Sequence, residues 1–252
     1  MTESSTTKIE GRNAVLEAIR AGRTIDRVYV ASGGDKDRSM GRIIALAKSA
    51  GAVISDVDRR KLDQMSETGA HQGVIAVASE YSYSTIAEIL AIASERGEPP
   101  LLVICDEISD PHNLGAIMRS AEGSGAHGVV IPKRRSAGFS SAVVEKSSAG
   151  AISHIAVARV ANISAAIREL KSAGVWVCGA DSGSGSTLWE RDFTPPIAFV
   201  VGSEGEGLGR LVAENCDYLV RIPMFGKVES LNASNAAAIL LYETARQRSL
   251  KQ

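Results

Sequence analysis

Two glycine-rich segments in the last third of the chain carry residue types suited to ligand binding. Residues 202–208 alternate glycine with serine and glutamate, and residues 222–235 combine Gly226 with serine and asparagine. Each segment follows an apolar run typical of a buried strand, 197–201 and 218–222. Glycine lets the backbone approach a ligand closely, because it has no side chain and tolerates positive φ. The two loops therefore predict a pocket for a nucleoside-like molecule held largely by backbone groups.

The elements that must position these loops follow an alternating α/β pattern from residue 101 onward. The run 101–105 is apolar throughout, as in a parallel sheet buried on both faces. Further strands are expected at 128–131, 155–160, 175–180, 197–201 and 218–222. Helices are expected at 113–124, 141–148, 164–173, 206–215 and 233–248. This half of the chain is therefore predicted to be an α/β domain with a parallel sheet.

The N-terminal part predicts a second, smaller α/β domain. Its helices are expected at 13–21, 38–50 and 59–65, and its strands at 25–31, 52–57 and 73–79. We expect residues 1–10 to be a disordered tail and residues 11–79 to form this domain. Residues 80–99, which include a helix at 86–94, are interpreted as a linker ending in a double proline. The larger domain then occupies residues 100–252.

Composition excludes several classes of protein. No apolar run approaches the ~18 residues of a membrane span, and the polar N-terminus does not resemble a secretory signal, so a cytoplasmic location is expected. The three cysteines form no CxxC pair and the four histidines show no ligand spacing, so no metal site is expected. A nicotinamide-dependent enzyme is disfavoured, because neither predicted domain has a GxGxxG after its first strand.

Charge gives a weak case for nucleic-acid binding. The net charge is −1, with 12 Lys/Arg and 10 Asp/Glu in residues 1–79 against 16 and 19 in the rest. Contact with RNA would depend on short basic runs such as 133–135 and 59–61. From charge alone, such runs are equally compatible with a solvated surface.

Three segments together resemble one enzyme family. They are residues 106–121, 202–208 and 222–235, in that order along the chain. The set is similar to the three signature motifs of the SpoU/TrmH family of RNA ribose 2′-O-methyltransferases. Residues 9–15, 71–73 and 131–136 also resemble the branch that methylates guanosine in 23S rRNA. The resemblance implies a sheet whose last segment threads a loop to form a deep trefoil knot, which periodicity cannot reveal.

The resemblance also implies S-adenosylmethionine as the methyl donor and a homodimer built across the last helix. The cofactor-binding positions that it implies are Gly202, Glu204, Gly205, Ile222, Met224, Ser230, Leu231 and Asn232. The last helix carries a run of small apolar residues from Ala236 to Leu241, which is compatible with burial against its own sheet or against a second copy. The second copy is the interpretation that the resemblance favours.

The implied catalytic positions are Arg119, Asn113, Glu204, Ser230 and Asn232. A ribose hydroxyl is a poor nucleophile at neutral pH, so it must be aligned and its developing charge stabilised. The family role of the arginine is that of a general base, but a guanidinium hardly deprotonates, which favours a stabilising role for Arg119. Asn113, Ser230 and Asn232 are also compatible with helix capping, and Glu204 with an exposed turn.

Candidate RNA contacts are Arg12, Lys133, Arg134, Arg135 and Lys146. Lys146 is equally compatible with an ordinary helix surface. The favoured hypothesis is methylation of a guanosine ribose in 23S rRNA, with the small domain gripping structured RNA. Alternatives are a tRNA or an antibiotic-resistance rRNA site, or a non-catalytic RNA-binding factor in ribosome assembly.

Overall fold

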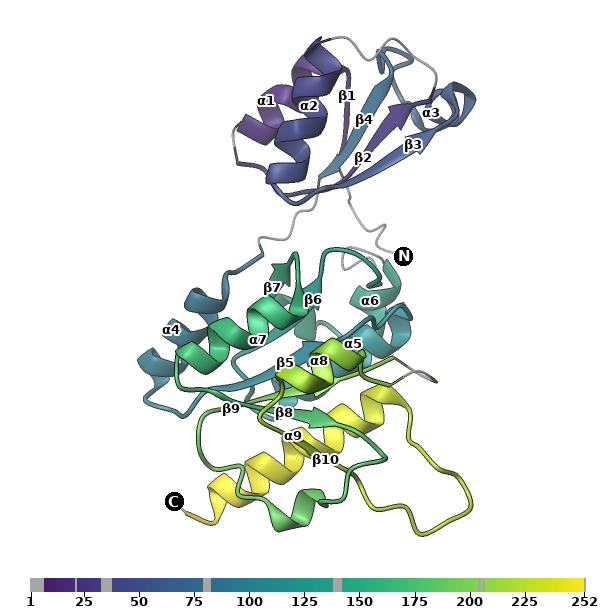
Figure 1. Ribbon diagram of the computed structural model, residues 1–252. Helices are drawn as coiled ribbons and strands as arrows, with labels where there is room; N and C mark the ends of the chain where they lie inside the picture. Colours follow the sequence, from purple (N-terminus) through teal and green to yellow (C-terminus); the bar gives the residue numbers. More distant parts are fainter. Residues whose placement is uncertain are drawn as a thin grey trace. The chain divides into compact units, whose positions relative to one another are not determined.

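The computed structural model describes residues 7–20, 22–32, 38–78, 83–137, 142–203, 205 and 207–251, without the side chains of Thr7, Ala142, Glu145 and Lys146. The chain divides into two compact units, Met1–Ser82 and Tyr83–Gln252 (Figure 1). None of the described helices is long and apolar enough to cross a membrane.

The first unit has a four-stranded mixed sheet with helices on both faces. Its elements are β1 (Thr7–Glu10), α1 (Arg12–Arg20), β2 (Ile25–Ala31), α2 (Arg38–Ser49), β3 (Val53–Val57), α3 (Arg59–Met65) and β4 (Val74–Ala78). The strand order is β1-β4-β2-β3, in which only β2 and β3 are parallel. In Figure 1, α1 and α2 lie on one side of this sheet and α3 on the other.

Helical spacing explains the core of the first unit. Val15, Ala18 and Ile19 are buried on one face of α1, at intervals of three and four residues. They pack with α2 and with inward-facing residues of β2 and β4, such as Val28 and Ala76. On the opposite face of the sheet, α3 buries Leu62 against Ile75. The unit thus has a core on each side of its sheet.

The expectation of a disordered tail over residues 1–10 is wrong for its last four residues. β1 (Thr7–Glu10) pairs antiparallel with β4, from Thr7 opposite Ala78 to Glu10 opposite Ile75. Four residues show too little alternation to be recognised as a strand, and the partner strand lies more than 60 residues away. Residues 1–6 of the predicted tail lie outside the described residues.

The second unit contains a six-stranded, fully parallel sheet in the order β10-β8-β9-β5-β6-β7. Its elements are α4 (Ile86–Arg96), β5 (Leu101–Cys105), α5 (Pro111–Gly123), β6 (Gly128–Pro132), α6 (Ala142–Ser147), η1 (Ala151–Ser153), β7 (Ala156–Val160), α7 (Ile163–Ser172), β8 (Trp176–Ala180), η2 (Leu188–Glu190), β9 (Ile197–Val201), α8 (Arg210–Asn215), β10 (Tyr218–Val220) and α9 (Ala233–Ser249). The predicted α/β class with a parallel sheet is confirmed.

Helices cover both faces of this sheet. One core joins α4, α7 and α8 to alternate residues of the strands, including Leu102 and Ile104 of β5. On the other side α5 lies against α9, and both contact the central strands. Every residue of β5 and β9 is buried as a result, which explains why these two strands are apolar without interruption.

Two local expectations differ from the structure. The segment interpreted as a linker contains α4, which begins at a Thr85–Glu88 capping box and buries Ile86 and Ile89 in the core of the second unit. The helix expected over 206–215 begins only at Arg210. The threading of a knot stays a prediction, because strand order and pairing do not define it.

Candidate active site

A cavity of about 760 Å³ lies at the carboxyl ends of β8, β9 and β10. Its volume is in the range of pockets that bind small molecules. The residues that line it are Ala180, Asp181, Ser182, Val201, Gly202, Ser203, Gly205, Gly207, Leu208, Val220, Ile222, Met224, Glu229, Ser230, Leu231, Asn232, Ala233 and Ala236.

Strand order explains why distant segments meet here. β10, β8 and β9 are neighbours in the parallel sheet, so the loops that follow them emerge at the same edge. These loops begin at Arg221, Asp181 and Gly202. A ligand at the carboxyl ends of the strands is the usual arrangement in open α/β sheets.

The loop after β9 is compact and depends on glycine. The backbones of Ser203 and Gly207 donate hydrogen bonds to each other's carbonyl oxygens at 3.1 and 3.0 Å. A Cβ atom on Gly202 would lie 2.1 Å from the carbonyl oxygen of Gly207, so a side chain at this position is incompatible with the turn. Gly205, with φ +93°, requires the left-handed region that glycine favours.

The end of this loop is anchored to β5 through Asp106. The amide of Gly209 donates to Oδ2 of Asp106 at 2.8 Å, and the Asp106 side chain is buried. Burial raises the pKa of Asp106 above its ordinary value, although the Gly209 hydrogen bond opposes the shift. The contact fixes one wall of the cavity to the central strand.

The loop before α9 is held differently. Residues 223–231 make no hydrogen bond or ion pair with any residue that the structure describes, although four of them line the cavity. Backbone N–H and C=O groups normally find partners, from protein or water. These groups are therefore available to a bound molecule.

An amide pair joins the start of α9 to the start of α5. Nδ2 of Asn232 donates to Oδ1 of Asn113 at 2.9 Å. Asn232 also caps α9, because its Oδ1 accepts from the backbone and the hydroxyl of Ser234 at 2.8 and 2.6 Å. Asp110, rather than Asn113, caps α5. The capping and site interpretations thus coexist for Asn232, and capping is wrong for Asn113.

Most of the predicted cofactor-binding residues lie around this one cavity. All of those that lie within the described part of the chain line the cavity: Gly202, Gly205, Ile222, Met224, Ser230, Leu231 and Asn232. Glu204 lies outside the described residues. Asn113 reaches the cavity edge through Asn232. Arg119 does not line the cavity; it is exposed on α5, and its guanidinium contacts no hydrogen-bond partner among the described residues.

None of the predicted RNA contacts is among the described residues that line this cavity. Arg12 begins α1, where its backbone and Nε donate to Oε1 and the carbonyl oxygen of Gln72 at 3.1 and 3.2 Å. Lys133, Arg134 and Arg135 follow β6, and Arg135 pairs with Glu107 at 2.8 Å. Lys146 belongs to α6, but its side chain lies outside the described residues.

Sequence reasoning missed one side of the cavity. Asp181 and Ser182 follow β8 and line the wall beside the two glycine loops. The signal was available, because 182–186 is a run of glycine and serine after a strand, like the other two loops. Without the strand order, nothing indicated that β8 lies between β9 and β10.

The lining fits a cationic nucleoside better than a phosphorylated one. Its described residues include the carboxylates Asp181 and Glu229 but no Lys or Arg, and Leu208, Ile222 and Leu231 supply apolar surface. A phosphate would lack a basic partner here, whereas a sulfonium ion would find carboxylates nearby. S-adenosylmethionine carries such an ion on an adenosine. Among the described residues, no cluster of His, Cys, Asp or Glu could hold a metal ion.

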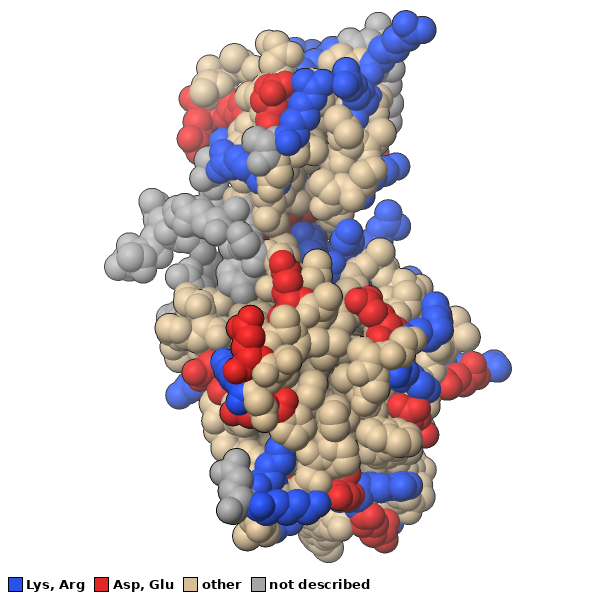
Figure 2. Space-filling model, turned by 90° about the vertical axis from the view of Figure 1, so that its left-hand side faces the viewer, with Lys and Arg blue, Asp and Glu red and all other residues tan. Residues whose placement is uncertain are grey.

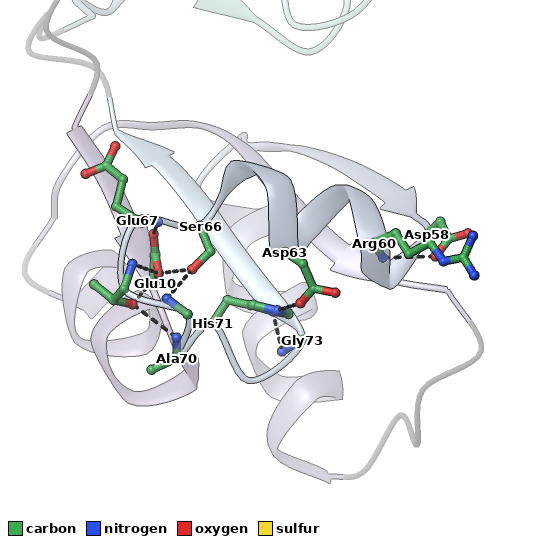
Figure 3. Close-up of polar contacts among 11 residues, drawn as sticks. Glu10, Asp58, Arg60, Asp63, Ser66, Glu67, Ala70, His71 and Gly73 are labelled. Carbon is green, nitrogen blue, oxygen red and sulfur yellow. Dashed lines mark hydrogen bonds and ion pairs between the residues drawn. The ribbon is translucent and has the colours of Figure 1, made fainter.

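A second polar network organises the loop 66–73 of the first unit (Figure 3). Glu10 accepts hydrogen bonds from the hydroxyl of Ser66 and the amide of Glu67 at 2.5 and 2.6 Å, and from the amide and hydroxyl of Thr68. Burial opposes ionisation of Glu10, but these hydrogen bonds outweigh it and lower its pKa to about 2. The carboxylate therefore fixes this loop.

His71 continues the same network. Its ring is buried, and Nδ1 accepts from the amide of Gly73 at 3.1 Å, which leaves the proton on Nε2 to donate to Asp63 at 2.8 Å. The turn at 71–73 is therefore held by the side chain of His71.

Comparison with known proteins assigns both units. Residues 100–242 match the SpoU rRNA Methylase family, and residues 8–84 match the family described as RNA 2′-O ribose methyltransferase substrate binding. Bacillus subtilis YacO, named as a TrmH-family tRNA/rRNA methyltransferase, is 47% identical over 238 residues that cover 94% of each chain. An uncharacterised tRNA/rRNA methyltransferase of Mycolicibacterium smegmatis is also 47% identical, covering 94% of this chain and 76% of the relative.

A solved structure agrees with these sequence matches. The SpoU methyltransferase AviRb from Streptomyces viridochromogenes superposes with a TM-score of 0.62 and 25% identity, covering 99% of this chain and 92% of AviRb. With the matches above, this chain belongs to the SpoU/TrmH family of RNA methyltransferases, and S-adenosylmethionine is the cofactor that this membership assigns to it.

Proposed function

We propose that this enzyme transfers the methyl group of S-adenosylmethionine to a ribose 2′-OH, with a guanosine of 23S rRNA as the favoured target. The observation that carries the proposal is the cavity at the ends of β8, β9 and β10, where two glycine loops meet the Asn113–Asn232 pair. The match of residues 8–84 to a ribose methyltransferase substrate-binding family supports the choice of acceptor.

The two loops hold the cofactor in this proposal. The backbone groups of 222–231 receive the adenosine, and Gly202 and Gly205 let the chain pass close to it. Leu231 and Ile222 cover the faces of the base, and the carboxylates of Asp181 and Glu229 favour the positive charge. When bound, S-adenosylmethionine supplies an electrophilic methyl group on sulfur.

The protein must then activate a weak nucleophile. The ribose hydroxyl becomes reactive only as its proton passes to solvent water, so groups that stabilise the developing alkoxide accelerate transfer of the methyl group to this oxygen. A guanidinium stays protonated in proteins, and we assign Arg119 to that stabilisation rather than to proton abstraction. Asn113, fixed by Asn232 at 2.9 Å, orients the acceptor at the cavity edge.

A second copy of the chain completes the site. Arg119 is exposed and lies outside the cavity wall of its own chain. α9, which lies against α5, also exposes Ile239 and Tyr242, at 37% and 54%. Pairing of two copies across α9 buries this surface and brings each Arg119 toward the partner's cavity.

The first unit binds the RNA in this proposal. Figure 2 shows Lys and Arg side chains gathered along one part of this unit on the face drawn, with Asp and Glu gathered beside them, whereas the second unit carries both signs interspersed. Arg12 lies at the start of α1, where it contacts the turn around Gln72. Clustered positive charge of this kind binds phosphates without reading sequence.

Arg119→Ala tests the catalytic assignment. We expect methyl transfer to fall roughly 100-fold or more, because a preorganised charge at the reacting oxygen is lost. Binding of S-adenosylmethionine, measured by calorimetry, should be retained. Unchanged methylation by the variant would refute the role of Arg119 and leave a non-catalytic RNA-binding factor as the better interpretation.

Mixing variants tests the second copy. An Arg119→Ala chain retains its cavity, and a chain that cannot bind cofactor retains its arginine. If Arg119 acts across the dimer, co-refolding the two inactive chains restores part of the methylation. If it acts within one chain, the mixture stays inactive.

The substrate is tested directly with labelled methyl groups. Transfer to naked rRNA, assembled ribosomal subunits and tRNA should be compared, followed by mass spectrometry of the digested RNA. We expect label in a 2′-O-methylguanosine of 23S rRNA. Label in tRNA alone would select the second candidate, which is favoured by the tRNA/rRNA naming of YacO.

A further inference from the structure

Two exposed aromatic rings stack beside the cavity. The centroids of Trp189 and Phe225 lie 6.1 Å apart with an interplanar angle of 18°. The two residues are 60% and 88% exposed. Large aromatic side chains left this open usually contribute to binding or to positioning rather than to the core.

Phe225 lies in the loop that forms one wall of the cavity. Its neighbour Met224 lines the cavity, as do residues 229–232. Residues 223–231 make no hydrogen bond or ion pair to the described part of the chain. The stack on Trp189 is therefore the specific contact that this structure gives to the middle of the loop.

Trp189 lies in η2, a short helix that is fixed by a capping box and by backbone hydrogen bonds. It is the middle residue of η2, which begins with a Thr187–Glu190 capping box and buries Leu188. The amide of Leu188 donates to the carbonyl oxygen of Arg221 at 3.0 Å, and the amide of Arg221 donates to Ser186 at 2.9 Å. These bonds tie η2 to the chain directly after β10, where the loop begins.

We propose that Trp189 is a positioning residue, which holds the 222–231 loop in its cofactor-binding conformation through the stack on Phe225. This inference rests on the proposed function of the cavity. Trp189 itself does not line the cavity, so it acts through the loop. Ordering a loop before binding reduces the entropy lost when the ligand arrives, and affinity rises accordingly.

Calorimetry with S-adenosylmethionine and S-adenosylhomocysteine tests the proposal. Trp189→Ala should weaken binding roughly 3- to 10-fold, the effect of losing one aromatic pair. Trp189→Phe retains a ring and should bind nearly as the parent does, whereas Phe225→Ala should behave as Trp189→Ala does. Trp176→Phe, which removes the other tryptophan, is the matched control and should not change the affinity.

Fluorescence gives a second readout. In a Trp176→Phe background, Trp189 is the sole tryptophan, so its emission should change when ligand orders the loop. Adding Phe225→Ala should remove most of that change. Thermal unfolding by circular dichroism should be the same for all these variants, because both rings are exposed.

The possible outcomes separate this inference from the proposed function. If the parent protein shows no heat with either ligand, the cofactor cavity itself is refuted. If the parent binds and Trp189→Ala binds equally well, the positioning role is refuted. An unchanged cofactor affinity with weaker RNA binding, or with loss of the dimer, would also overturn it and make the pair a docking surface.

Discussion

The loops 66–73 and 222–231 are both largely exposed, yet they are held in opposite ways. In the first unit, Glu10 binds Ser66, Glu67 and Thr68, and His71 binds Gly73. In the second unit, residues 223–231 make no hydrogen bond to the described residues, and a single aromatic stack contacts their middle.

The first loop is therefore already hydrogen-bonded within the protein, whereas the second has polar backbone groups that a ligand can bind. The loop 66–73 is held by hydrogen bonds to Glu10 and His71, so its shape is already fixed before RNA arrives. A loop with unpaired backbone groups beside a cavity of about 760 Å³ can gain hydrogen bonds from a bound molecule. The extent of internal hydrogen bonding therefore distinguishes the loop 66–73 of the first unit from the loop 222–231 at the cofactor site.

Gly202→Ala should produce the largest effect. The new Cβ would lie 2.1 Å from the carbonyl oxygen of Gly207, so the loop must open. We expect S-adenosylmethionine affinity to fall roughly 100-fold or more, because the cavity wall is lost. Calorimetry measures the affinity, and circular dichroism verifies that the chain is folded.

Gly185→Ala is the matched control for this change. Gly185 lies in the loop after β8, with nothing within 4 Å of an added Cβ. The affinity of the Gly185→Ala variant for S-adenosylmethionine should equal that of the parent. Equal binding by Gly202→Ala and Gly185→Ala would show that the tight turn is not part of the cofactor site.

Glu10→Gln should have a smaller effect, on the stability of the first unit. The substitution weakens the hydrogen bonds that a charged acceptor receives, so the free energy of unfolding should fall by about 1–2 kcal/mol near neutral pH. The folded pKa of Glu10 is lowered from 4.5 to about 2. Its contribution is therefore present above pH 4.5 and lost as the pH falls through about 2.

Urea unfolding at a series of pH values measures this dependence. The difference in free energy of unfolding between the parent and Glu10→Gln should shrink as the pH falls from 4.5 toward 2. Both tryptophans, Trp176 and Trp189, belong to the second unit, so their fluorescence transition should stay unchanged while far-UV circular dichroism shifts. A difference that is constant with pH would refute the charged role of Glu10.

Much of the fold followed from local pattern. The apolar runs at 101–105 and 197–201 predicted buried parallel strands, and β5 and β9 have those bounds. The glycine loops predicted the cavity, because a strand that ends in glycine places free backbone at the sheet edge. Gly202, Ile222 and Leu231 all line it.

The features that the sequence did not predict depend on contacts between residues far apart in the chain. β1 was missed because its partner β4 lies more than 60 residues away, and α4 was assigned to a linker because its burial against β7 is not encoded in its own sequence. Asp181 lines the cavity only because β8 lies between β9 and β10. Strand order is a tertiary property that periodicity does not contain.

Hydrogen–deuterium exchange with and without S-adenosylhomocysteine tests the central claim most directly. We predict that the amides of residues 224–231 become protected when the ligand binds, because it pairs their free groups, whereas exchange across 66–73 stays the same. Unchanged exchange in 224–231 at saturating ligand would contradict a cofactor held by the backbone of this loop.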